Sequence, residues 1–260
     1  MQESDVKTAA TVKSLTRGLS ILEAFDHGNP KLGITEISKK TGLAKSTVYR
    51  LIQTLCELSY VIPIKAEDKY TLGPKVLNLG FSVLSSLELR DMASPYIRNL
   101  SQAIGETVNL AVLDGWQLTY VDRVKTQQIV NINLHIGSRL ELYNTSMGRV
   151  LAAFQGEEWL EKYFEYLRRL PEAGDYWKDS GKRLLTILED VRDKGYAINN
   201  EELAPGLRSV AAPVKKRTGE VVGAVNIAVS SSRFSLERLK EELILPLHAT
   251  TQAISAALGY

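Results

Sequence analysis

The sequence predicts an α+β protein with more than one domain, and three observations indicate it. A length of 260 residues is sufficient for two domains. Before residue 105 most apolar residues recur at helical intervals, whereas longer strand-like runs begin at about residue 106. In that second part, strand-like runs come first and last with helical stretches between and after them, which is typical of a mainly antiparallel sheet.

The composition argues against disulfide-rich and membrane proteins. A single cysteine, Cys56, excludes an internal disulfide framework and every multi-thiolate metal site. No apolar run approaches the roughly eighteen residues that a membrane span needs, and the polar N-terminus lacks the apolar core of a signal peptide. We therefore expect a cytoplasmic protein that has no membrane association.

The small excess of positive charge lies in the N-terminal part. Residues 1–73 hold ten lysines and arginines against eight aspartates and glutamates, and the rest of the chain holds twenty-two of each. Between Glu36 and Glu57 there is no carboxylate, yet three lysines and one arginine fall in that window. A local basic face on a nearly neutral protein favours nucleic-acid binding, although a solvated lysine-bearing surface is also common.

The first helices are expected within residues 14–42. Leu15, Leu19, Leu22 and Phe25 form the apolar stripe of an amphipathic helix, which the run HGNPKLG ends. A short second helix follows, with Thr35 as its expected N-cap. It ends at Gly42, because glycine readily adopts the left-handed conformation just past a helix end.

A third helix, from about Ala44, has two distinct sides. Val48, Leu51, Ile52 and Leu55 make one apolar stripe, so polar residues occupy the remaining surface, and none of them is acidic. Such a mixture of cations, hydroxyls and amides suits phosphates and base edges. A short helix, a glycine turn and a polar-faced helix together predict a helix-turn-helix unit.

Two β-prone runs, Tyr60–Ile64 and Lys69–Leu72, then flank the polar turn KAED. A hairpin in this position is the wing of a winged helix-turn-helix. Its tip carries Lys65 and Lys69, which are positioned to reach phosphates beside the groove.

The remaining elements are expected in this order. Pro74 suits the first turn of an apolar connector helix, and Pro95 opens or kinks the next helix, which Gly105 ends. Asp114-Gly115 separates two strands as a hairpin turn, and Val130, Ile132, Leu134 and Ile136 fit one face of another strand. The later elements are helices in SMGRVLAAF, EEWLEKYFEYLRRL and SGKRLLTILEDVRDKG, strands in SVAAPVKK and EVVGAVNIAV, and a final helix over 236–258 with a possible kink at Pro246.

The sequence resembles the IclR family of bacterial transcriptional regulators over about residues 14–258. The matching segments are SLTRGLSILEAF, LGITEISKKTGLAKSTVYRLIQTLCELSYV, KYTLGPKVLNLG, GETVNLAVLDG, VDRV, IGSRLELYNTSMGRVLAA, GYAINNEELAPGLRSVAAPV and GEVVGAVNIAV. The resemblance implies a DNA-binding domain over 1–73, a linker helix over 74–90 and a GAF-like effector-binding domain over 91–260. The residues expected to read or anchor DNA are Thr35, Lys45, Ser46, Thr47, Tyr49, Arg50, Lys65 and Lys69.

The resemblance also implies a pocket for a small-molecule effector. The expected lining is apolar at Ile129, Ile132, Leu140 and Leu207, and polar or small at Ser146, Met147, Asn199, Ser209, Asn226 and Ala228. Asn199 and Ser209 replace an acid and a cysteine that the family commonly has, so the site loses a negative charge and a thiol. Together with a helix N-terminus near Ser146, this favours an organic acid. Loop capping is the alternative role for these polar residues.

No catalytic constellation is apparent, and we expect no cofactor and no metal. The three histidines, His27, His135 and His248, are widely spaced, and no nucleotide-binding or nucleophile-elbow motif occurs. The leading hypothesis is a regulator of double-stranded operator DNA that is controlled by an effector and acts as a homodimer or tetramer. The alternatives are an enzyme with a winged interaction module, or a sensor that has lost DNA binding. Repressor and activator both remain open.

Overall fold

The computed structural model describes residues 11–26, 28–86, 88–126, 134–177 and 181–259. The chain divides after Ser86 into two compact units, which are described separately below. Among the described residues, no helix is long and apolar enough to span a bilayer.

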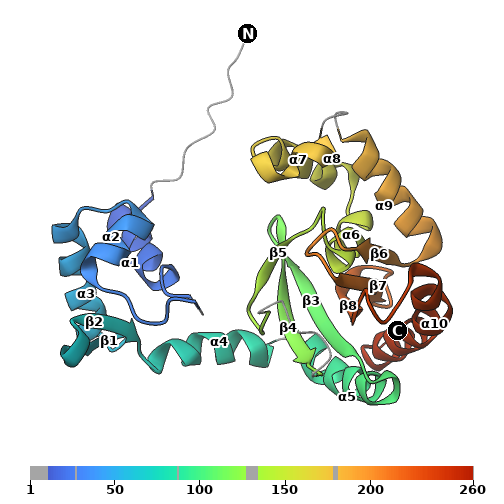
Figure 1. Cartoon of the computed structure of the whole chain (residues 1–260), viewed down its shortest axis with the longest axis horizontal. Coiled ribbons are helices and arrows are strands. Elements are labelled where there is room, and N and C mark those ends of the chain that lie inside the picture. The colour runs from blue at the N-terminus through green and yellow to red at the C-terminus, as the bar shows by residue number, and fades with distance from the viewer. Residues whose placement is uncertain (1–10, 27, 87, 127–133, 178–180, 260) are drawn as a thin grey trace, which may run out of the picture. The chain divides into compact units, whose positions relative to one another are not determined.

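The first unit is a helical head with a small hairpin. Its elements are α1 (Lys13–Glu23), α2 (Ile34–Thr41), α3 (Lys45–Glu57), β1 (Val61–Ile64), the 3-10 turn η1 (Lys65–Glu67), β2 (Lys69–Leu72) and α4 (Lys75–Ser86) (Figure 1). β1 and β2 pair antiparallel, so the expected wing is present. The core of this unit consists of Ile21, Ala24, Phe25, Leu32, Ile37, Val48, Ile52 and Val61.

Two expectations for the first unit are wrong. The N-cap of α2 is Gly33 rather than Thr35, and the Glu36 side chain accepts the N–H of Gly33 at 2.7 Å. The stripe along α1 is also shifted: Ile21 and Phe25 are buried, while Leu15 and Leu19 are 61% and 50% exposed. The beginning of α1 therefore presents apolar side chains that do not belong to this core.

The second unit is built on one six-stranded sheet in the order β5-β4-β3-β8-β7-β6, and every described pairing is antiparallel. This confirms the predicted α+β class. The strands are β3 (Thr107–Asp114), β4 (Gln117–Val124), β5 (Arg139–Glu141), β6 (Ala197–Asn200), β7 (Leu207–Lys215) and β8 (Val221–Ser230). The helices are α5 (Glu88–Ile104), α6 (Ser146–Ala153), α7 (Glu157–Leu167), η2 (Pro171–Ala173), α8 (Gly174–Trp177), α9 (Lys182–Lys194) and α10 (Leu236–Ala257).

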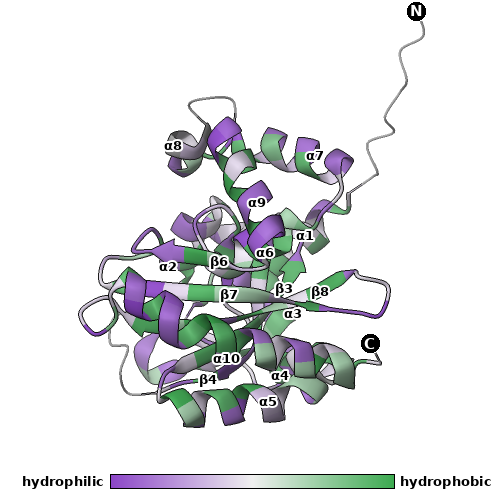
Figure 2. Ribbon diagram, turned by 90° about the vertical axis from the view of Figure 1, so that its right-hand side faces the viewer, coloured by the Kyte–Doolittle hydropathy of each residue, from purple (hydrophilic) through white to green (hydrophobic). Residues whose placement is uncertain are grey.

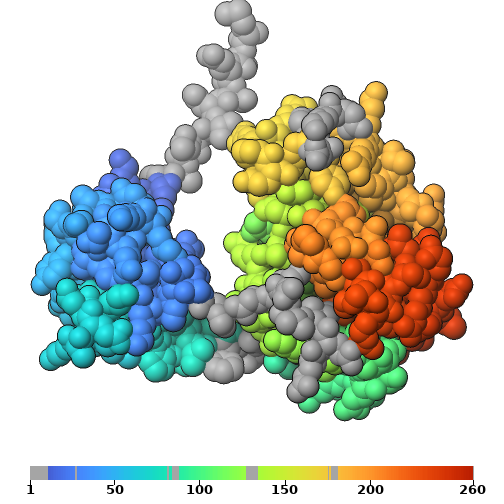
Figure 3. Space-filling model, in the orientation of Figure 1, coloured from blue at the N-terminus to red at the C-terminus, as the bar shows by residue number. Residues whose placement is uncertain are grey.

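Helices cover both faces of this sheet. α5 and α10 pack on one face with β3, β7 and β8, and α6 packs on the other face with α9 behind it (Figure 1). Each face has its own apolar cluster, one around Leu110, Val210 and Leu243 and the other around Leu118, Leu151 and Leu184. Apolar colour runs along β7 and β8, as expected for strands covered on both sides (Figure 2). α10 is amphipathic and lies at the surface of the unit (Figure 3).

Some boundaries differ from expectation. Pro95 lies inside α5, which begins at Glu88, and Pro246 lies inside α10. Of the alternating run expected as a strand, Val130 and Ile132 are outside the described residues, and Leu134 and Ile136 belong to no strand. β6 was not predicted separately, because its four residues, AINN, are too short and polar for an alternation signal.

Gly148 tests how tightly α6 packs. A Cβ at this position would overlap the backbone of Leu142 and the hydroxyl of Thr145. We expect Gly148→Ala to lower the free energy of unfolding by about 3 kcal/mol, because the backbone of Leu142 and the packed side chain of Thr145 would have to move. Gly174→Ala is the matched control, since nothing lies within 4 Å of its added Cβ and its backbone is helical. Urea denaturation should show Gly174→Ala to be neutral or stabilised by about 0.5 kcal/mol; equal losses for both variants would contradict the packing argument.

Candidate functional site

α3 presents a polar, basic face to solvent. Val48 and Ile52 are fully buried in the core of the head, and this orientation leaves Lys45, Tyr49 and Arg50 exposed on the other side. Tyr49 is 54% exposed. Ser46 is also exposed, and Thr47 is half-buried. The residues expected on the reading face are therefore together on one accessible surface.

The charges on this face are not neutralised internally. Elsewhere in the head, Lys40 pairs with Asp26 at 2.5 Å and Lys31 pairs with Glu67 at 2.6 Å. Within the described residues, neither Lys45 nor Arg50 forms an ion pair. Their positive charge is thus available to an external anion.

The remaining basic candidates surround this helix. Lys65 is exposed in η1 at the tip of the wing, where Asp68 has a φ of 49°. Lys69 lies 3.7 Å from Glu36, so it has a weak partner at the surface. Thr35 is exposed near the start of α2.

The second unit contains a small, partly open cavity between the sheet, the start of α6 and the loop that joins β6 to β7. Its volume is about 20 Å³, which is room for about one water molecule. The lining residues are Asn109, Tyr120, Arg123, Leu134, Thr145, Ser146, Met147, Asn199, Leu203, Leu207, Ser209, Asn226 and Ala228. No aspartate or glutamate is among the described lining residues, and Arg123 is the one charged residue there.

Polar side chains close this cavity by bonding to one another. The hydroxyls of Ser146 and Ser209 are 2.7 Å apart, and Asn109 Nδ2 donates to Asn226 Oδ1 at 2.7 Å. Asn199 Nδ2 donates to the carbonyl of Asn144 at 2.6 Å. These groups are buried, so a ligand that separated them would have to supply replacement hydrogen bonds.

Seven of the ten residues expected in the effector pocket line this cavity. They are Ser146, Met147, Asn199, Leu207, Ser209, Asn226 and Ala228. Leu140 does not line it, because it lies on edge strand β5 and packs against the apolar cluster instead. Ile129 and Ile132 are outside the described residues.

The sequence reading missed the contribution of β3 and β4. Asn109, Tyr120 and Arg123 come from these strands, and burial raises the pKa of the Tyr120 phenol to about 12. Burial also lowers the pKa of Arg123, whose Nε is buried without an acceptor among the described residues. The sequence did contain a signal: Asp122 and Arg123 are consecutive charged residues in a strand, and their side chains point to opposite faces of a sheet. One charged side chain was therefore to be expected on the face that carries the cavity.

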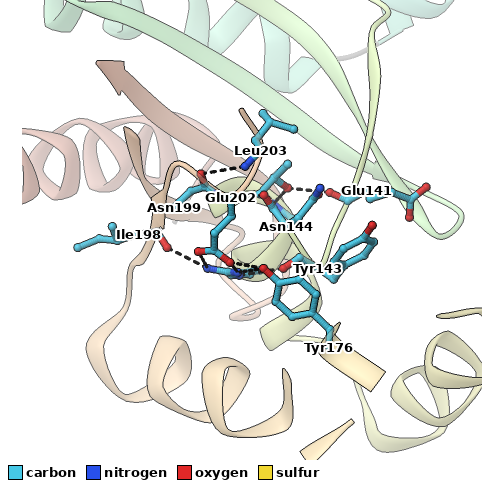
Figure 4. Close-up of polar contacts among 11 residues, drawn as sticks. Glu141, Tyr143, Asn144, Tyr176, Ile198, Asn199, Glu202 and Leu203 are labelled. Atoms are coloured by element: carbon cyan, nitrogen blue, oxygen red, sulfur yellow. Dashed lines mark hydrogen bonds and ion pairs between the residues drawn. The ribbon is translucent and has the colours of Figure 1, made fainter. Parts of the chain in front are cut away.

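A second polar cluster lies directly beside the cavity. Arg149 on α6 is 4% exposed, and its guanidinium donates to the carbonyls of Tyr143 at 3.0 Å and Ile198 at 3.1 Å. It also donates to both carboxylate oxygens of Glu202, and Glu202 Oε2 accepts the hydroxyl of Tyr176 as well (Figure 4). Burial alone would raise the pKa of Glu202, but the bonds from Arg149 and Tyr176 outweigh it and lower that pKa below its ordinary value.

No catalytic or metal-binding arrangement is found in the described ranges. No group of three His, Cys, Asp or Glu side chains is placed to hold a metal ion there. His135 precedes β5, and His248 on α10 makes an edge contact with the ring of Tyr196. His27 lies outside the described residues.

The chain is similar to known proteins over almost all of its length. A model of the IclR helix-turn-helix domain matches residues 14–62, and a model of the bacterial transcriptional regulator IclR C-terminal region matches residues 81–256. The transcriptional regulator KdgR of Escherichia coli K12 is 34% identical, and the match covers 98% of this chain and 95% of KdgR.

Two solved structures share the fold. A putative transcriptional regulator from Rhodococcus sp. RHA1 matches with a TM-score of 0.80 and 37% identity, over 96% of this chain and 99% of that one. An IclR homolog from Microbacterium hydrocarbonoxydans, complexed with 4-hydroxybenzoate, matches with a TM-score of 0.79 over 95% and 99%. At 22% identity, this second likeness concerns the fold alone.

The lowered pKa of Glu202 predicts a pH-dependent contribution to stability. The folded protein favours the carboxylate, so this contribution is complete above the ordinary pKa of 4.5 and is lost as the pH falls through the lower folded value. We expect the difference in unfolding free energy between the parent and Glu202→Gln to be largest above pH 4.5 and to shrink below it. Urea denaturation across a pH series measures this difference. Glu241→Gln, exposed on α10, should show no comparable change; an identical profile for both variants would refute the assignment.

Proposed function

The chain belongs to the IclR family of bacterial transcriptional regulators, and from this premise we propose that an organic acid bound in the second unit controls binding of operator DNA by the first. The relatives are DNA-binding regulators and not enzymes. The observation that carries the proposal is the charge of the cavity, because its described lining contains one guanidinium and no carboxylate.

Arg123 is the main attraction for an anion. Its guanidinium stays charged in proteins, and a charge in a partly buried position has lost solvation that a carboxylate can replace. Among the described residues, the Arg123 Nε has no acceptor and the nearby Asn109 Oδ1 has no donor, which marks both as polar groups that are open to a ligand. The N-terminus of α6, at Ser146 and Met147, adds backbone N–H groups and the positive end of the helix dipole.

The other side of the cavity suits an apolar body. Met147, Leu203 and Leu207 line it together with the ring of Tyr120. A compact organic acid with a hydrocarbon or aromatic part combines both properties. The complex of the Microbacterium hydrocarbonoxydans homolog with 4-hydroxybenzoate gives a practical first ligand to test.

In the first unit, the exposed face of α3 is the proposed reading surface. Lys45, Ser46, Thr47, Tyr49 and Arg50 would contact base edges and phosphates in the major groove. Lys65 and Lys69 on the wing would contact flanking phosphates, with Thr35 at the start of α2. Binding of a phosphate would compete with the weak Lys69–Glu36 contact.

A homodimer, or a tetramer formed from two dimers, is the proposed assembly. One winged head covers only half of a symmetric operator. Several exposed apolar side chains in the first unit support a second copy as partner, because association would remove them from water. They are Leu15 and Leu19 on α1 and Leu77, Leu79 and Val83 on α4.

Replacing either unpaired cation on α3 should weaken DNA binding. We expect Lys45→Ala and Arg50→Ala each to cost about 1–3 kcal/mol of operator affinity, because each removes contacts to phosphate or base. The measurement is fluorescence anisotropy with the DNA upstream of the protein's own gene, across a salt series. Lys162→Ala on α7 removes the same charge from the other unit and should leave affinity unchanged. Unchanged affinity in both α3 variants would show that the reading face is elsewhere.

Changes in the cavity should affect the effector but not operator binding without effector. We expect Arg123→Gln to weaken binding of 4-hydroxybenzoate about tenfold or more while affecting the uncharged 4-hydroxybenzamide much less, because only the carboxylate uses the guanidinium charge. Asn226→Leu or Ser209→Leu should lower affinity for both ligands by removing lining hydrogen bonds. Calorimetric titration measures this, and Arg139→Gln on β5 is the control. Equal loss for acid and amide in Arg123→Gln would contradict the anion assignment.

A further inference from the structure

Arg149 connects the two walls of the cavity. On α6, Ser146 and Met147 line the cavity shortly before Arg149, whose guanidinium reaches the carbonyls of Tyr143 and Ile198. On the β6–β7 loop, Leu203 lines the cavity, and the preceding residue, Glu202, reaches the guanidinium of Arg149. One ion pair therefore joins the helix wall to the loop wall, immediately outside the space that a ligand would fill.

The same pair completes the edge of the sheet. β6 is the last strand, so its outer backbone groups have no neighbouring strand. The carbonyl of Ile198 accepts from Arg149, and the backbone N–H of Asn200 donates to the carboxylate of Glu202. Figure 4 shows Glu202 and Tyr176 converging beside the Ile198 carbonyl. Opening the pair would expose these groups as well as the two charges.

A second acid in the loop has a different role. Glu201 accepts the N–H of Gly206 at 2.8 Å and pairs with Arg208 at 3.3 Å. All of these partners belong to the loop or to β7, so Glu201 shapes the loop wall without reaching α6. Glu201 thus stabilises the conformation of the loop, whereas Glu202 attaches the loop to α6.

The cavity is small, so the attachment of the loop to α6 affects how a ligand can enter. About 20 Å³ cannot hold an organic acid, so the cavity must widen when a ligand enters. The other described bonds across the walls are neutral: Ser146 with Ser209, and Asn199 with the Asn144 carbonyl. Hydrogen bonds between ionised groups are about twice as strong as neutral ones, so the Arg149–Glu202 pair dominates the resistance to opening.

We propose that Arg149, Glu202 and Tyr176 form a clamp that positions the helix and loop walls and sets how often the cavity opens. These are positioning residues, because none of the three is needed to contact the ligand. The link to effector affinity rests on the function proposed above. The link to opening is measurable without any ligand.

The test uses thiol labelling of the full-length protein. Cys56→Ser removes the single cysteine, and Ser209→Cys then places a reporter in the buried cavity lining. In this background we expect Glu202→Gln to raise the rate of labelling about tenfold or more, because one charge of the clamp is removed. Tyr176→Phe should raise it by a smaller factor, and it keeps the ion pair if Glu202→Gln does not fold. Glu201→Gln, the matched control, should stay within about twofold of the parent.

A second reporter distinguishes opening of the cavity from general unfolding. Ala212→Cys lies on the same strand, β7, but is fully buried against the α5 and α10 face. Its labelling should not change in Glu202→Gln. An unchanged rate at Ser209→Cys in both clamp variants, or an equal rise at both reporters, would overturn the proposal. A rise as large in Glu201→Gln as in Glu202→Gln would also overturn it, since the loop alone would then control access.

Adding 4-hydroxybenzoate separates this inference from the proposed function. Slower labelling of Ser209→Cys in the presence of this acid supports ligand binding in the cavity, and an unchanged rate counts against that assignment. Neither result alters the comparison of clamp variants without ligand, which alone decides the inference. If the clamp controls opening and the acid binds in the cavity, Glu202→Gln should also accelerate association of 4-hydroxybenzoate in stopped-flow measurements by a similar factor.

Discussion

The second unit depends on the burial of one guanidinium. A cation this enclosed is tolerated only when its donors are satisfied and a counter-charge is present. Arg149 meets both conditions with acceptors from α6's own preceding turn, from β6 and from the β6–β7 loop. The same carboxylate that neutralises it also holds Tyr176, whose phenol pKa is raised to about 12 by burial and by Glu202. Leu203, which follows Glu202, and Ser146 and Met147, which shortly precede Arg149, line the neighbouring cavity.

Such a site is possible because the two faces of the sheet differ in polarity. One face is covered by α5 and α10, and its buried residues form an apolar cluster. The other is apolar under α6 and α9 but carries Asn109, Ser209 and Asn226 on neighbouring strands, where their side chains meet. Polar groups in a protein interior persist when they bond to one another, and they become a binding site when a ligand offers better partners.

In the head, one helix has both a core side and a solvent side. The core of the head is small, and α3 contributes one side to that core while Lys45, Tyr49 and Arg50 stay exposed on the other side. Lys31 and Lys40 have ion-pair partners in the head, whereas Lys45 and Arg50 on α3 have none among the described residues. Leu15 and Leu19 on α1 and Leu77 and Leu79 on α4 are exposed and take no part in this core.

The sequence by itself determined the features that depend on near neighbours along the chain. Val48 and Ile52 are buried as the helical period predicted, Gly42 ends α2, and the hairpin at Asp114-Gly115 forms. Seven cavity residues were also anticipated, through the family resemblance. Tertiary structure decided what depends on residues distant in sequence. Leu15 and Leu19 carry the same periodic signal as buried residues, and only the extent of the core excludes them. The inward side of Arg123 depends on the register of β4, and Arg149 meets Glu202 across 53 positions of chain. Periodicity reports which side of an element is apolar, but not which distant side chains share a buried space.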